Sequence, residues 1–519
     1  MLYDGFVDSE RRHARRPAAA IAGRAISYEA LGRLARHFAS GLLELCGDPR
    51  RVGILTGRDD VSYAAVLGTL LAGAAFVPLN SAYPPERLRA IASAARLDAV
   101  VVAGAGRRHL PHLLDLPAAP RVLLADGRRG EAGLPGDALD DERLRRLPPL
   151  DRPVPRRPDD VAYLMFTSGT TGAPKGVPIT HANADHFLRV VSARYCPTAE
   201  DRFSQLFEHS FDLSLFDLFT AWGAGACACA LSPVAVLRDA AGVVARTGLT
   251  VWFSTPSLAT EIERRGLAPA ALLGLRLSLF CGEALTEATA AAWWRAAPNS
   301  VLENLYGPTE ATVACAAYRW PGPCGVTENE VVPIGDVHPG LSALLLADGG
   351  AVDLRDAGAG VEGDLCLAGP QVFAGYWDAA GDDRCFVTHA GRRYYRTGDR
   401  VRTAETGLRF LGRMDDQVKV RGYRVELGEV EHALRQADGV DDAVALTYRH
   451  GGGDTELAAF VLGRTPDPAR ALTRARRLLP PHAVPSRVHA LTDPPRNANG
   501  KIDRTELRRR LESSGELGT

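Results

Sequence analysis

Lysine is almost absent from this sequence of 519 residues. Only three of its 61 basic residues are lysines, Lys175, Lys419 and Lys501, and arginine supplies the rest. Arginine is a permanently charged planar fork, whereas lysine is a compact cation whose pKa its surroundings can tune. Because arginine occupies the positions where a solvated cation is enough, the three remaining lysines are candidates for chemistry.

Other shortages exclude several classes of protein. The net charge of −1 provides no basic field for nucleic acid. The first residues lack a signal-peptide pattern, and the longest apolar stretch, residues 64–79, is broken by two glycines and Pro78 and falls short of a membrane span. The nine cysteines are scattered, without paired CxxC motifs, and Cys227-Ala-Cys229 lies among small residues that indicate packing. We therefore expect a cytoplasmic protein with no membrane or nucleic-acid partner and no structural metal.

The pattern of apolar runs predicts an α/β protein. We expect more than one domain, because a chain of 55.5 kDa exceeds the size that a single hydrophobic core reaches. Strand-like runs at 51–56 and 76–79 flank a helical pattern at 61–75, which indicates parallel βαβ units. The alternation resumes at 160–370, with strands expected at 161–166, 249–254 and 277–281. Residues 103–158, rich in Pro, Arg, Gly and Asp, are interpreted as surface connections.

The last third of the chain has a different pattern. After residue 331 the runs shorten and turns multiply, which predicts a small β-rich subdomain. Beyond residue 416, helices are expected at 427–436 and 470–479 and strands at 443–448 and 457–462, enough for a separate α+β domain of about 100 residues.

A glycine- and hydroxyl-rich loop, Thr167-Ser-Gly-Thr-Thr-Gly-Ala-Pro-Lys-Gly176, follows an apolar strand. Its hydroxyls, free backbone N–H groups and one ammonium are the ingredients of a polyphosphate cradle. It does not match the GxxxxGK[ST] phosphate loop, because Pro174 precedes the lysine and no Ser or Thr follows it.

Together with this loop, further motifs make the chain resemble the adenylate-forming superfamily. That superfamily includes adenylation domains of nonribosomal peptide synthesis, acyl-CoA synthetases and luciferases. The motifs are Ala72-Gly-Ala-Ala-Phe-Val-Pro-Leu79, Phe211-Asp-Leu-Ser214, Asn304-Leu-Tyr-Gly-Pro-Thr-Glu310, Tyr395-Arg-Thr-Gly-Asp399, Gly412–Glu431 and Asn499-Gly-Lys501. The resemblance implies a large N-terminal domain of αβαβα layers with a small β-barrel-like subdomain (1–414), and a small mobile α+β C-terminal domain (415–519).

The resemblance implies that ATP and a carboxylate form an acyl-adenylate and pyrophosphate, and that the acyl group then passes to a thiol. Thr309 would contact the α-phosphate, Glu310 would hold Mg²⁺, Asp399 would bind the ribose hydroxyls and Tyr306 would stack on adenine. The remaining nucleotide-binding residues that it implies are Thr167, Ser168, Gly169, Thr170, Thr171, Gly172, Lys175 and Arg413.

The resemblance also assigns separate half-reactions to two of the lysines. Lys501 would bridge the substrate carboxylate and the phosphate during adenylation, and Lys419 would serve the second half-reaction after the small domain rotates about a hinge at Asp415. His209 matches a position that gates the thiol tunnel or orders the carboxylate in relatives. A simply packed histidine is the alternative.

Asp212 indicates the substrate class, because amino-acid-activating relatives use this position to bind the substrate ammonium. A buried carboxylate without a cation is costly, so an amine-bearing substrate makes physical sense of it. Asp217 is the rival, particularly for a β-amine, although a helix-cap or solvated role for Asp217 is the interpretation we favour. The other pocket positions implied by the motifs carry no charge: Leu213, Phe216, Phe253, Leu279, Cys281, Leu305, Val313 and Ala314.

An uncharged pocket predicts a small apolar amino acid, with alanine and proline leading and a β-amino acid as an alternative. Several strings also resemble D-alanine:carrier-protein ligases. No carrier motif follows residue 501, so we expect the thiol to be the phosphopantetheine arm of a separate carrier protein. The arginine-rich stretches 470–479 and 508–510 are either a docking surface for it or solvated helix faces. The rival functions are an acyl-CoA ligase for a non-amino acid and a non-catalytic scaffold.

Overall fold

The structure, a computed structural model, describes residues 1–126, 137–169, 174–323, 331–377, 385–449, 455–463, 466–491, 494–495 and 502–513. The chain divides into two compact units. The first comprises Met1–Ser81, Ala92–Phe166 and Gly176–Met414, and the second comprises Ala82–Ile91, Thr167–Lys175 and Asp415–Thr519.

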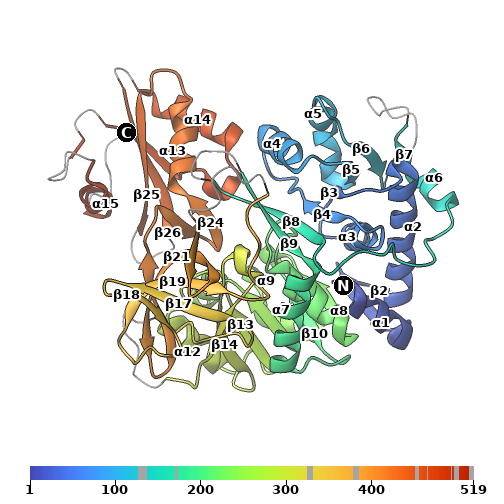
Figure 1. The fold of residues 1–519 in the computed structure, drawn as a ribbon, viewed down its shortest axis with the longest axis horizontal. Coiled ribbons are helices and arrows are strands. Elements are labelled where there is room, and N and C mark those ends of the chain that lie inside the picture. Colours follow the sequence, from blue (N-terminus) through green and yellow to red (C-terminus); the bar gives the residue numbers. More distant parts are fainter. Residues whose placement is uncertain are drawn as a thin grey trace. The chain divides into compact units, whose positions relative to one another are not determined.

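Two large sheets form the framework of the first unit (Figure 1). One has the strand order β7-β6-β5-β3-β4-β8-β9, with β7 Leu139–Asp140, β6 Arg121–Leu124, β5 Ala99–Val102, β3 Arg51–Leu55, β4 Ala75–Pro78, β8 Val161–Thr167 and β9 Lys175–Thr180. Its pairs from β7 through β8 are parallel. The βαβ prediction is therefore confirmed, with α3 (Asp60–Leu71) between β3 and β4.

The second large sheet has the order β16-β15-β14-β13-β12-β10-β11-β1-β2. Its strands are β16 Asp336–Val337, β15 Ala316–Arg319, β14 Val301–Tyr306, β13 Leu277–Phe280, β12 Val251–Ser254, β10 Arg202–Gln205, β11 Cys227–Ala230, β1 Pro17–Ile21 and β2 Arg24–Ser27. The strands from β14 through β1 in this order are parallel to their neighbours.

Alternate residues of these strands bury their side chains on opposite faces of the second sheet. Val251 and Phe253 join the large core that also takes in α2 (Tyr28–Cys46), α3 and α7 (His181–Tyr195), whereas Trp252 joins a second core. That second core packs against α9 (Pro233–Arg238), α10 (Ala240–Thr247), α11 (Pro256–Arg264) and α12 (Glu287–Ala296). The structure thus confirms a layered α/β fold, completed at the N-terminus by α1 (Asp4–His13) and after β10 by α8 (Ala221–Ala224).

The interpretation of residues 103–158 as surface connections is wrong in part. Val122, Leu123 and Leu124 of β6 are buried, and β6 pairs in parallel with β5. The apolar run is short, and its burial depends on the sheet edge that β5 provides. The segment also contains α5 (Leu110–Leu114), β7 and α6 (Asp141–Arg146).

The β-rich subdomain is an antiparallel sheet of order β18-β17-β19-β21-β20, with β22 paired to β21. Its strands are β17 Ser342–Ala347, β18 Gly350–Asp353, β19 Glu362–Ala368, β20 Phe386–His389, β21 Arg392–Ala404 and β22 Gly407–Arg413.

The second unit has its own core. It contains the hairpin β23 (Gln417–Val420) and β24 (Tyr423–Glu426), the sheet β25-β26-β27 (Asp442–Arg449, Thr455–Leu462, Arg487–Ala490), and helices α13 (Leu427–Arg435), α14 (Pro468–Leu478) and α15 (Arg504–Ser513). Four of these elements, α13, α14, β25 and β26, agree with the predicted segments to within two residues, and the other four were not predicted. α4 (Pro85–Ala95) begins in this unit and ends in the first.

Candidate functional site

Four of the nine predicted substrate residues lie where parallel strands of the second large sheet end. Phe253 lies on β12, Leu279 on β13 with Cys281 just beyond it, and Leu305 on β14. In open α/β sheets, ligands bind outside the carboxyl ends of the strands. The strand order thus places on neighbouring strands residues that are up to 52 positions apart in the sequence.

The structure places all eight apolar pocket residues in one buried cluster. None of them is more than 3% exposed. Phe216 and Phe253 pack edge to face with ring centroids 4.9 Å apart, and Phe207 approaches Phe253 at 5.2 Å. The surroundings of Phe253 are therefore aromatic and aliphatic.

Two carboxylates lie in the chain segment that borders this cluster. Asp212 is 6% exposed, and Asp217 is fully buried in a short π-helix, Phe216–Thr220. The cap or solvated role that we favoured for Asp217 is therefore wrong, because the π-helix turns this side chain inward.

The surroundings of Asp217 favour its neutral form. Burial raises the pKa of Asp217 well above its ordinary value. Neither carboxylate oxygen makes a hydrogen bond of good geometry with the described residues. The backbone amides of Leu206 and Phe207 and the Arg58 guanidinium lie close enough to offset only part of the rise in pKa.

The loop that carries Val313 and Ala314 has an unusual backbone. It follows a 3₁₀ turn at Thr309–Ala311, and Thr312 and Val313 have φ of +58° and +70°. Left-handed φ values are rare for β-branched residues, and each costs about 1–3 kcal/mol. The surrounding structure must therefore hold this loop.

Gln371 supplies that support. Its side chain is fully buried, and its Nε2 donates to the carbonyl oxygens of Ala314 at 2.8 Å and Ala311 at 3.2 Å. The Thr312 hydroxyl donates to the Gln371 carbonyl at 2.5 Å, and Gln371 Oε1 lies 3.2 Å from Nδ1 of His338.

The residues predicted to bind the nucleoside also meet. Asp399 on β21 lies opposite Arg413 on β22, and Arg413 Nη1 donates to its Oδ1 at 2.6 Å. The Tyr306 hydroxyl donates to the other carboxylate oxygen. Burial, and then the neighbouring Asp399 carboxylate, raise the pKa of Tyr306 well above its usual value. The tyrosine therefore remains a neutral donor.

Thr309 and Glu310 lie in the 3₁₀ turn Thr309–Ala311, which follows Tyr306 closely in the sequence. The Glu310 side chain is fully buried, and its Oε1 accepts a hydrogen bond of 2.7 Å from the Tyr376 hydroxyl. No group of three or more potential metal ligands occurs among the described residues.

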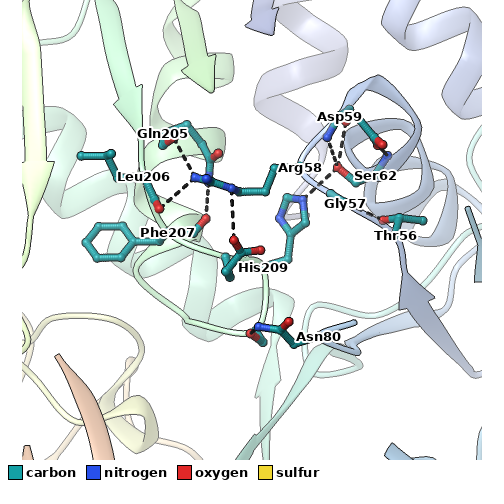
Figure 2. Close-up of polar contacts among 12 residues, drawn as sticks. Thr56, Gly57, Arg58, Asp59, Ser62, Asn80, Gln205, Leu206, Phe207 and His209 are labelled. Carbon is teal, nitrogen blue, oxygen red and sulfur yellow. Dashed lines mark hydrogen bonds and ion pairs between the residues drawn. The ribbon is translucent and has the colours of Figure 1, made fainter. Parts of the chain in front are cut away.

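His209 lies on the segment between β10 and Asp212. Its ring is buried, packs edge to face on Tyr63 with centroids 5.5 Å apart, and places Nε2 3.0 Å from the Ser62 hydroxyl (Figure 2). Burial, with a smaller effect from Arg58, lowers the pKa of His209 to about 4. The imidazole is therefore neutral at physiological pH.

The other predicted residues belong to the second unit. Thr167 ends β8, Ser168 and Gly169 follow it, and Lys175 begins β9. Lys419 is half-buried on β23, and Asp415 is exposed just before that strand. Thr170, Thr171, Gly172 and Lys501 lie outside the described residues.

Sequence reasoning missed the residues that support the site, above all Gln371, Tyr376 and Arg58. Arg58 follows β3 at the carboxyl edge of a parallel sheet, a position that could have marked it. The sequence contains no comparable signal for Gln371 and Tyr376, because their hydrogen-bond partners are distant in the sequence.

The AMP-binding enzyme family model matches residues 6–377. The chain therefore belongs to this family of AMP-forming adenylating ligases, as the motifs indicated.

Relatives of known name agree with this membership. The chain is 32% identical to L-proline--[L-prolyl-carrier protein] ligase of Pseudomonas fluorescens over 99% of both chains. It is also 32% identical to surfactin synthase subunit 1 of Bacillus subtilis, but it spans only 13% of that protein's length. The solved structure of the Vibrio cholerae adenylation domain AlmE in complex with glycyl-adenosine-5'-phosphate is 28% identical, covers 99% of this chain and 98% of its own, and superposes with a TM-score of 0.87.

The helices offer no candidate for a membrane span. Among the residues that the structure describes, none is both long enough and apolar enough to cross a bilayer.

Proposed function

We propose that this protein activates a small apolar amino acid as its aminoacyl-adenylate and transfers it to the phosphopantetheine thiol of a separate carrier protein. The observation that supports this most directly is Asp212, a nearly buried carboxylate whose sequence neighbours Leu213 and Phe216 belong to the buried apolar core. A substrate ammonium would pair with that carboxylate, and a small apolar side chain would fill the cluster.

The residues present fit ATP with Mg²⁺. Magnesium in nucleotide enzymes is commonly held by one or two carboxylates together with substrate phosphates, so Glu310, oriented by Tyr376, would hold it. The bound ion would offset the charge that the phosphates accumulate as the carboxylate attacks. Asp399 would accept from the ribose hydroxyls, with Tyr306 and Arg413 fixing its two oxygens.

The named relatives support the substrate class. One carries a prolyl-carrier-protein ligase name, and the AlmE adenylation domain was solved with a glycyl-adenylate. Both names concern small amino acids. Proline and alanine are therefore the first substrates to test.

Amino-acid-dependent ATP–pyrophosphate exchange tests the proposal. The panel should pair each amino acid with its des-amino analogue, such as L-alanine, D-alanine and β-alanine against propionate, and proline against cyclopentanecarboxylate. Exchange that requires the amine supports the proposal, and exchange with the simple acids alone would mean an acyl-CoA ligase. Absence of exchange with every acid in the panel would favour the rival hypothesis of a non-catalytic scaffold protein.

The acceptor needs a second assay. The preferred acid is incubated with ATP and either a phosphopantetheinylated carrier protein or free CoA, and the thioester is measured by mass spectrometry. We expect loading of the carrier protein at the higher rate.

A further inference from the structure

The segment Gln205–Ser210 connects β10 to the predicted ammonium-binding Asp212 and carries His209. In the close-up of Figure 2 it faces the β3–α3 turn, Thr56–Asp59, and the first turn of α3. Both belong to the first unit.

Arg58 holds this segment through three groups. Its Nη1 donates to the carbonyl oxygens of Leu206 at 2.9 Å and Gln205 at 3.3 Å, and its Nε pairs with the Glu208 carboxylate at 3.3 Å. Its side chain is only 15% exposed. The Leu206 carbonyl lies beyond the last residue of β10, whereas the Gln205 carbonyl also accepts from the Leu231 N–H at 3.0 Å. The planar guanidinium presents Nη1 to the two carbonyls and Nε to Glu208 in fixed directions, whereas lysine has a single nitrogen for all three groups.

Ser62 determines which nitrogen of His209 carries the proton. The Ser62 hydroxyl closes the capping box of α3: it donates to the Asp59 carbonyl at 2.7 Å and accepts from the Asp59 N–H at 3.1 Å. A serine hydroxyl has one proton and two lone pairs. In this arrangement the hydroxyl proton points to the Asp59 carbonyl and one lone pair faces the Asp59 N–H, which leaves the second lone pair for His209. Nε2, 3.0 Å away, is the matching donor, whereas a hydroxyl rotated toward the ring would make Nε2 the acceptor.

We propose that Arg58 and Ser62 are positioning residues, which fix the segment Gln205–Ser210 and hold His209 as the neutral imidazole protonated on Nε2. Tyr63 packs on this ring and Arg58 is the charged group that acts on it, while Glu208 pairs with Arg58 and Asp59 is bonded to Ser62. Burial and the Arg58 charge both disfavour the imidazolium.

The tautomer defines what His209 can offer a ligand. With the proton on Nε2 committed to Ser62, Nδ1 carries a lone pair and is an acceptor. It suits an N–H or S–H donor, such as the substrate ammonium or a thiol. Ordering a substrate carboxylate would require a donor at Nδ1, so it is the role that this arrangement opposes.

The tautomer can be tested without any substrate. ¹⁵N–¹H spectra of protein labelled in the histidine rings report which nitrogen is protonated, and the signal missing in His209→Gln identifies His209. In the wild-type protein we expect the proton of His209 on Nε2, with no titration of the ring between pH 5.5 and 8. In Ser62→Ala we expect a mixture of the two tautomers. Ser27→Ala, which removes the N-cap of α2, is the matched control and should leave the His209 signal unchanged. Protonation at Nδ1, or titration of His209 near pH 6.5, would overturn the assignment.

The positioning role rests on the proposed function and has its own kinetic test. In pyrophosphate exchange, Arg58→Lys should raise KM for the amino acid roughly 10- to 100-fold while KM for ATP stays within about twofold. Arg24→Lys is the control. Arg24 is 74% exposed and pairs with Asp60, the first residue of the helix α3 that follows Arg58.

The outcomes separate the two proposals. An unchanged amino-acid KM in Arg58→Lys, or a fall in kcat and melting temperature with no change in KM, contradicts the positioning role. If the wild-type protein shows no exchange with any acid, the proposed function fails. The spectra still decide the tautomer in that case.

Discussion

At the residue scale, the contrast between Asp212 and Asp217 carries the substrate prediction. Both are buried, but burial raises the pKa of Asp217 well above the ordinary range, which leaves Asp212 as the better partner for a substrate ammonium. An amide is nearly isosteric with a protonated carboxyl group. Replacing Asp217 by Asn therefore changes little chemically, whereas replacing Asp212 would remove the carboxylate that we propose to bind the substrate ammonium.

We expect Asp212→Asn to lower kcat/KM for the amino acid in pyrophosphate exchange at least a hundredfold, because loss of one partner of a buried ion pair costs about 3–5 kcal/mol. Asp217→Asn should lower it less than about tenfold. The reverse order would make Asp217 the partner and favour a β-amino acid.

At the element scale, the turn and loop from Thr309 to Ala314 show how a strained segment is maintained. Thr312 and Val313 adopt left-handed φ values, and Gln371, about 60 residues away, satisfies carbonyl groups of this loop. The strain is local, but the support comes from the loop that follows β19.

Gln371→Leu keeps the side-chain bulk and removes the donors. It should reduce the free energy of unfolding by about 1–3 kcal/mol, because buried carbonyl groups lose their partners. It should also raise KM for the amino acid. Urea unfolding and exchange kinetics measure these effects, with Gln436→Leu on an exposed turn as the control. Unchanged stability would show that the loop holds its own conformation.

At the scale of the whole molecule, buried neutral histidines link stability to pH. Burial lowers the pKa of His181, His209 and His338 to about 4. Between pH 4 and 6.5 these three histidines bind more protons in the unfolded chain than in the folded one, whereas Asp217, whose pKa is raised, acts in the opposite direction. The contribution of the histidines to stability therefore rises with pH through this window and is lost as the pH falls.

We expect the urea midpoint to drop from pH 6.5 to 4.5, with each histidine contributing about 1.4 kcal/mol per pH unit. His181 Nδ1 accepts from the Leu2 N–H at 3.0 Å, so His181→Asn can keep an acceptor while removing the titration. The urea midpoint of this variant should depend less steeply on pH than that of the wild type. His112→Asn, at an exposed position, should leave this pH dependence unchanged. A midpoint that rises on acidification contradicts this account.

Lys419 and Lys501, the two lysines beyond residue 414, give a prediction for the complete reaction. Lys501→Ala should abolish adenylate formation, because the substrate carboxylate and phosphate lose their shared cation, yet transfer from preformed adenylate should persist. Lys419→Ala should chiefly slow the transfer. Exchange and single-turnover thioester assays separate the steps, and equal loss of both in either variant would refute this division.

The sequence alone determined the family, the layered α/β fold and most of the second unit, because motif spacing and apolar periodicity are local properties of the chain. Lys175, Asp399 and Asp212 could be selected from such strings. Only the tertiary structure showed that Asp217 is buried, that β6 belongs to the sheet, and that Arg58, Ser62 and Gln371 support the site. Their partners are distant in the sequence, and the folded chain brings them together. The tautomer that we propose for His209 rests on such contacts, which no stretch of sequence contains.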